Sequence, residues 1–162
     1  MNPIAELAGF FAARAIWCVS DDGPLVPIYA YELESGQRGM DRLIVADSGE
    51  AQTVGRERLR NNPHGAVRGV LVYDAFVNSG GLRHDAIVIE SQDYVAGVTL
   101  TILVPYRPVD SPEGFGVLPA ELFAHSGLNI ERSREVLEPF FAGVDSHEKG
   151  GDVWNAHLLE HD

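Results

Sequence analysis

The sequence of 162 residues is poor in cysteine and lysine. Cys18 is its one cysteine, so no disulfide can form within the chain, as is usual in a reducing compartment. Lys149 is its one lysine; the other basic residues are arginine, and the formal net charge is −12. Because a net negative field repels nucleic acid and anionic lipid, we expect neither as a partner.

Long hydrophobic runs are also scarce. The run over 4–19 is interrupted by Glu6 and Arg14, and no basic segment precedes it. We therefore expect neither a signal peptide nor a membrane span, and we expect a cytoplasmic protein. With 45% hydrophobic and 22% charged residues, the composition is typical of one soluble globular domain.

Signatures of catalysis and of nucleotide binding are missing as well. The chain has no G-x-S-x-G elbow, no P-loop and no G-x-G-x-x-G pattern. Ser20, Asp22 and a histidine supply the residue types of a hydrolase triad, but no sequence motif brings them together. Cys18 lies on the apolar face of the first expected helix, where we expect it to be buried. The sequence thus predicts no catalytic residue and no cofactor.

Hydrophobic periodicity and turn residues predict the elements of the first two thirds of the chain. They are a helix over 3–18, strands over 25–33 and 41–46, a helix over 49–62, and strands over 66–77, 84–90 and 98–104. Asp47 and Glu50 form a capping box at the start of the second helix. Leu100 and Ile102 belong to a strict apolar alternation, so we expect the last three strands to form an antiparallel meander with that face buried.

The last third of the chain is predicted to be less regular. It comprises a loop over 107–116, a short helix over 119–124, a helix after Asn129 that Pro139 kinks or splits, a polar linker over 146–151 and a final helical turn or two. We thus expect one domain over 1–145, followed by a linker and tail over 146–162. Deleting 152–162 is expected to leave the fold intact.

These elements predict an α+β domain with a five-stranded, mainly antiparallel sheet and helices packed against it. The order α-β-β-α-β-β-β-α resembles that of roadblock and longin-type domains, in topology alone. Domains of those families are mainly interaction modules, so the resemblance implies a role in protein–protein contact.

Three groups of residues are candidate sites. Tyr73, His84, Tyr106 and Arg107 lie toward one end of the meander and are candidates for binding a small molecule. On the first helix, Phe10 and Trp17 flank Arg14 beside the core face and are candidates for docking a partner; on the second helix, so are Arg56 and Arg60. His147, His157 and His161 are candidate metal ligands.

Of the three candidate sites, the histidine group is the one that matches a known catalytic motif. His157-Leu158-Leu159-Glu160-His161 matches H-x-x-E-H, an inverted zinc-peptidase pattern. The chain runs only one residue further, so a third ligand would have to come from His147 or another element. We expect any bound ion to be adventitious, without a catalytic site.

Three functions remain open at this point. The first is a non-enzymatic interaction module that acts as a homodimer with an unknown protein partner. The second is a small-molecule-binding or hydrolase-like protein with its pocket at the end of the meander. The third is an acidic inhibitor or immunity-type protein, because 109–162 carry 11 acidic and 3 basic residues.

Overall fold

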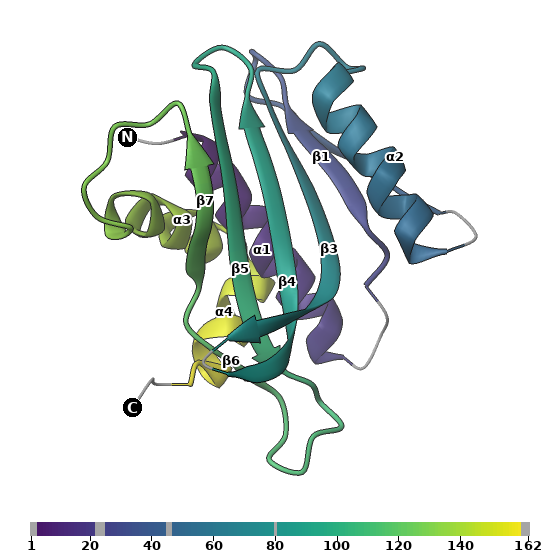
Figure 1. Cartoon of the computed structure of the whole chain (residues 1–162), viewed down its shortest axis with the longest axis vertical. Helices are drawn as coiled ribbons and strands as arrows, with labels where there is room; N and C mark the ends of the chain where they lie inside the picture. The colour runs from purple at the N-terminus through teal and green to yellow at the C-terminus, as the bar shows by residue number, and fades with distance from the viewer. Residues whose placement is uncertain (1–2, 22–24, 45–46, 80, 160–162) are drawn as a thin grey trace.

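The computed structural model describes residues 3–21, 25–44, 47–79 and 81–159, and it shows one α+β domain (Figure 1). The expected fold class is confirmed. The helices are α1 (Pro3–Ser20), α2 (Ser48–Asn61), α3 (Arg134–Ser146) and α4 (Glu148–His157). The strands are β1 (Ile28–Glu32), β2 (Arg38–Arg42), β3 (Arg68–Ser79), β4 (Leu82–Asp93), β5 (Val98–Arg107), β6 (Gly116–Val117) and β7 (Glu121–Ser126).

The sheet is antiparallel throughout, in the order β2-β1-β3-β4-β5, with β6 and β7 both paired to the free edge of β5. The described residues thus contain seven strands, where the sequence predicts five. The helix predicted over 119–124 is wrong, because this segment forms most of β7. The unpaired edge of β5 offers it a full backbone ladder, and this pairing overrides local propensity.

The second strand is also shifted from its prediction. It covers 38–42 instead of 41–46. The turn after Glu32 is short, so the pairing of β1 with β2 already begins with Glu32 opposite Arg38. The pairing then places Arg42 opposite Ile28, which is buried against α1. This register brings Arg42 to the face of the sheet that α1 covers.

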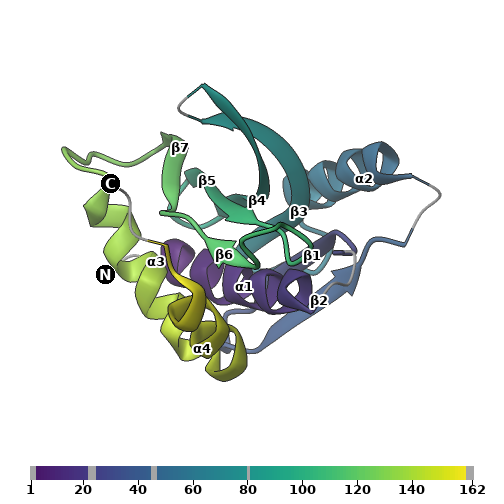
Figure 2. The same ribbon diagram turned by 90° about the horizontal axis from the view of Figure 1, so that it is seen from below.

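The main core lies between the sheet and α1 (Figure 2). α1, α3 and α4 lie on one face of the sheet, and α2 lies on the other. Leu100 and Ile102 are 1% and 0% exposed, so the predicted inward face of β5 is confirmed. α2 covers a smaller cluster on β1 and β3, and Asp47 caps it by accepting a hydrogen bond from the Glu50 N–H at 2.7 Å.

α1 extends two residues beyond the helix predicted over 3–18, and it is strongly apolar. It has 18 residues with a mean hydropathy of 1.2, which meets the minimum for a membrane-spanning helix by length and composition. Glu6 and Arg14 alone do not lower the mean below this minimum, and the absence of a membrane span stays a prediction from the sequence. In this fold 61% of the segment is buried, and the helix forms the centre of the core.

The C-terminal segment is part of the domain. A polar linker was expected over 146–151, but α4 begins at Glu148 and packs against α1, with Trp154 only 1% exposed. Gly150 makes this possible, because a Cβ atom there would lie 2.3 Å from the carbonyl oxygen of Ala13. The glycine pair that suggests a linker therefore permits close helix packing.

α3 runs without a break through Pro139, so the predicted split does not occur. Pro139 lies in the second turn and removes one backbone hydrogen bond, the one to the carbonyl of Glu135. Phe140 and Val144, both buried in the main core, hold the following turns in place.

Candidate functional site

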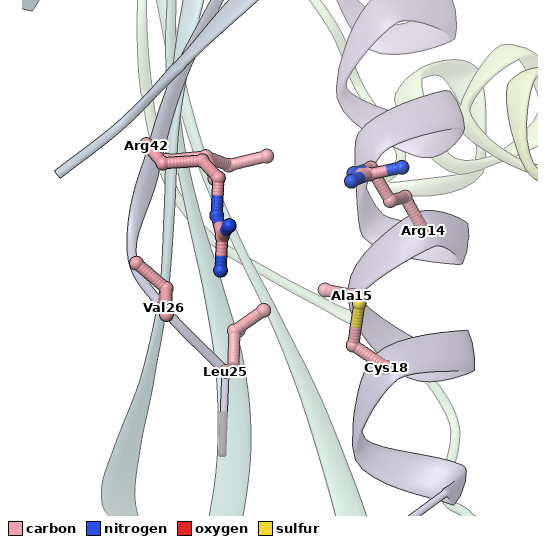
Figure 3. A pocket seen from close by; sticks show the side chains of 7 residues that line it. Arg14, Ala15, Cys18, Leu25, Val26 and Arg42 are labelled. Atoms are coloured by element: carbon pink, nitrogen blue, oxygen red, sulfur yellow. The ribbon is translucent and has the colours of Figure 1, made fainter. Parts of the chain in front are cut away.

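A hollow of about 140 Å³ lies between α1 and the chain that enters β1 and β2 (Figure 3). α1 contributes one wall, and the segment before β1, β1 itself and the end of β2 contribute the other. Its lining residues are Arg14, Ala15, Cys18, Leu25, Val26, Ile28 and Arg42.

Helical spacing and strand register assemble this hollow. Arg14 and Cys18 are four residues apart on α1, so their side chains lie one above the other on one face. Arg42 reaches the same space because its partner Ile28 faces α1. Residues that are far apart in the sequence therefore meet beside the core.

Both guanidinium groups extend into the hollow, from opposite walls (Figure 3). Within the residues that the structure describes, neither Arg14 nor Arg42 has an ion pair or a side-chain hydrogen bond. Other arginines have carboxylate partners, namely Arg38, Arg56, Arg58 and Arg68. Two like charges that face one hollow without a counterion form an arrangement that attracts an anion.

Cys18 lies on the α1 wall beside these arginines. Its thiol is free and half-buried, so the expectation that it is buried in the core is only partly met. Figure 3 shows its sulfur at the side of the hollow, one turn along the helix from Arg14. Because it is the chain's only cysteine, it is a specific reporter of what occupies the hollow.

The four residues expected at the end of the meander do not all meet. His84, Tyr106 and Arg107 line an open hollow of about 350 Å³. The Tyr106 hydroxyl donates to Asp74 Oδ2 at 2.7 Å. Burial is the main cause that raises the pKa of Tyr106, and the hydrogen bond to Asp74 is the second. Arg107 Nε donates to the carbonyl of Gly114 at 2.7 Å. Tyr106 and Arg107 are thus engaged by the chain itself.

Tyr73 belongs to the other face of the sheet, under α2. Its hydroxyl donates to Glu90 Oε2 at 2.5 Å, and Arg56 donates to both groups at 3.0 Å. Burial and then the neighbouring Glu90 raise the pKa of Tyr73 to about 12. Arg56 therefore fastens α2 to the sheet, whereas Arg60 is exposed and has no ion pair among the described residues.

The aromatic residues expected to dock a partner are largely covered by the chain itself. The Phe10 ring lies 4.9 Å from the His147 ring, with the Arg38 guanidinium carbon 4.8 Å above it. The Trp17 ring lies 5.9 Å from His147 and 5.1 Å from the ammonium nitrogen of Lys149. Both rings therefore support the junction of α3 and α4.

The candidate metal ligands do not converge in the described part of the chain, and no cluster of three or more ligand residues occurs there. His147 and His157 lie at opposite ends of α4, about 15 Å apart along its axis at 1.5 Å per residue. His147 Nδ1 accepts from the Gly150 N–H at 2.9 Å, which also occupies that nitrogen. His161 lies outside the described residues.

Arg42 and the pair of His64 and Asp41 are not among the site residues predicted from the sequence. His64 Nε2 lies 2.8 Å from Asp41 Oδ2, and its ring stacks on Tyr31 at 4.0 Å between centroids. Arg58 reaches the same carboxylate oxygen at 3.3 Å, so this group ties the end of α2 to the hairpin. A signal for Arg42 existed: it shares a strand face with the apolar Met40 in a strongly acidic chain.

The hollow brings together two cationic groups and apolar side chains, and its described lining side chains include no nucleophile–base pair. Comparison of the chain with protein-family models, with curated proteins and with solved structures gives no match.

Proposed function

We propose that this protein is a non-catalytic binding protein that holds a small anion in the hollow between α1 and the β1–β2 hairpin. The observation that carries this proposal is the pair of guanidinium groups of Arg14 and Arg42, which enter the hollow from opposite walls and have no ion-pair partner among the described residues. A cytoplasmic location remains a prediction from the sequence.

The charges of Arg14 and Arg42 support this proposal. Guanidinium groups form bidentate, charge-assisted hydrogen bonds with carboxylates and phosphates. An anion between them relieves their mutual repulsion, although water screens this attraction in part because Arg14 is half-buried and Arg42 is exposed. For so small a hollow we expect a dissociation constant between about 10 µM and 1 mM.

Alkylation of Cys18 tests the proposal. Iodoacetamide is uncharged, so its rate of reaction with Cys18 reports access to the hollow without competing for the arginines. We expect succinate and inorganic phosphate to slow labelling in a saturable manner. Arg14→Ala and Arg42→Ala should weaken this protection at least about tenfold, the equivalent of about 1.4 kcal/mol.

Arg60→Ala is the matched control, because it removes the same charge from an exposed position away from the hollow. It should leave the protection unchanged. If no small anion protects Cys18, or if Arg60→Ala weakens protection as much as Arg14→Ala does, the proposal is wrong.

A second candidate function is self-association, as the sequence analysis expects, and one observation favours it. β7 is an edge strand with most of its residues exposed, and Phe123 is 70% exposed at a bulge in the pairing with β5. The opposite edge, β2, carries Arg38, Asp41 and Arg42, which discourage strand addition. β7 is therefore the edge on which a second copy would add its own β7.

Light scattering after size exclusion tests this candidate. A homodimer gives a mass near twice the 17.6 kDa of the chain, and Ala124→Pro, which removes a backbone donor from β7, gives the monomer mass. A wild-type monomer at micromolar concentration would exclude it.

A further inference from the structure

We infer that the ligand of the Arg14–Arg42 hollow is a compact dianion that carries no ammonium group, such as a short aliphatic dicarboxylate or a phosphate monoester. This inference rests on the proposed function and adds the chemical class of the ligand.

The first step concerns the number of charges. Among the described residues, the lining side chains include two guanidinium groups and no carboxylate. A monoanion would neutralise one arginine and leave the other beside it without a counterion. A dianion neutralises both, and each carboxylate or phosphate edge accepts two hydrogen bonds from one guanidinium.

The second step concerns the ligands that the hollow excludes, namely those with an ammonium group. None of the described lining side chains carries an amide, hydroxyl or carboxylate oxygen, so the weakly accepting sulfur of Cys18 is the sole side-chain acceptor in this described set. A ligand ammonium group would lose water without a side-chain partner and would lie near two cations. This arrangement discriminates against amino acids, because unpaired polar groups are costly to bury.

The third step concerns size and the apolar wall. A volume of about 140 Å³ corresponds to roughly five water molecules at about 30 Å³ each. Leu25, Val26 and Ile28, with Ala15 opposite, present aliphatic atoms to the space. A chain of a few methylene groups between two carboxylates satisfies both the volume and this surface.

Isothermal titration calorimetry of the 162-residue chain with four small ligands tests each of these requirements separately. Succinate has two carboxylates; L-aspartate is succinate with an added ammonium group; monomethyl succinate keeps one charge; methyl phosphate supplies the dianion in another form. We expect succinate and methyl phosphate to compete for one site. L-aspartate and monomethyl succinate should bind at least about tenfold more weakly than succinate.

Variants assign the selectivity to the two arginines. In Arg42→Ala, the preference for succinate over monomethyl succinate should disappear, because the one remaining guanidinium group in the hollow can pair with only one carboxylate. Arg60→Ala should keep the wild-type preference. Circular dichroism of each variant verifies that it is folded.

The outcomes distinguish the inference from the proposed function. If L-aspartate or monomethyl succinate binds as tightly as succinate, the inference is wrong while the anion site stands. If none of the four probes binds or protects Cys18 from alkylation, the proposed function fails, and the inference with it.

Discussion

His147 caps α4 through a hydrogen bond that requires an unprotonated Nδ1. That nitrogen accepts the Gly150 N–H. The ring contacts those of Phe10 and Trp17, and the ammonium nitrogen of Lys149 lies 5.1 Å from the Trp17 ring. Burial first, and the charge of Arg14 second, lower the pKa of His147 below its usual value near 6.5. The neutral ring is therefore part of the native structure.

The sign of the pH effect follows from this lowered pKa. The contribution of His147 to stability is complete above about pH 6.5, where the unfolded chain is also neutral, and is lost as the pH falls toward the lower folded-state pKa. Urea unfolding between pH 7.5 and 5 should show the free energy of unfolding decreasing. His147→Asn keeps a capping oxygen and does not titrate, so its decrease should be smaller; an equal decrease would contradict this role.

At the scale of single elements, β5 supplies the simplest stability test. Ile102 is fully buried in the main core, whereas its neighbour Thr101 lies on the opposite face. Ile102→Ala should lower the free energy of unfolding by about 2–5 kcal/mol through lost contacts and a cavity. Thr101→Ala should cost less than about 1 kcal/mol. Equal losses would mean that the register of β5 differs from the one described.

The elements differ in how far the sequence predicts them, for physical reasons. The meander is predictable because Leu100, Ile102 and their neighbours alternate with the period of a half-buried strand. β7 is not, because an exposed edge strand such as 121–126 carries little apolar alternation. α4 is predicted only in part, as a final helical turn or two after 151, because Gly150 and Gly151 resemble a linker until α1 is in place beside them.

The same distinction applies to the candidate sites. The sequence shows that Arg14 lies beside the core face of a helix, which is a local property. That Arg42 joins it depends on the pairing of β1 with β2 and on the packing of α1, which are long-range contacts. The charge of Arg56 is visible in the sequence, but its pairing with Glu90, on a distant strand, is not.

At the scale of the whole molecule, the C-terminal helix is required for the main core. Trp154 is 1% exposed and its ring contacts those of Phe140 and Phe141 at 5.9 Å between centroids. The expectation that deleting 152–162 leaves the fold intact conflicts with this burial. Trp154→Ala should lower the free energy of unfolding by about 3–5 kcal/mol in urea titrations.

His157→Ala is the control on the same helix, because its side chain is exposed. It should cost less than about 1 kcal/mol. A Trp154→Ala variant as stable as His157→Ala would mean that α4 does not dock on α1.

The proposed anion site depends on two arginine side chains, on the position of α1 beside the β1–β2 hairpin, and on a domain whose net charge of −12 is otherwise unfavourable to anions. The most direct test is a crystal structure of the full chain grown with succinate. We predict one succinate between Arg14 and Arg42, with nitrogen–oxygen distances of about 2.7–2.9 Å to each guanidinium. An empty hollow with succinate bound elsewhere, or Arg14 and Arg42 paired with carboxylates of the chain itself, would contradict the account.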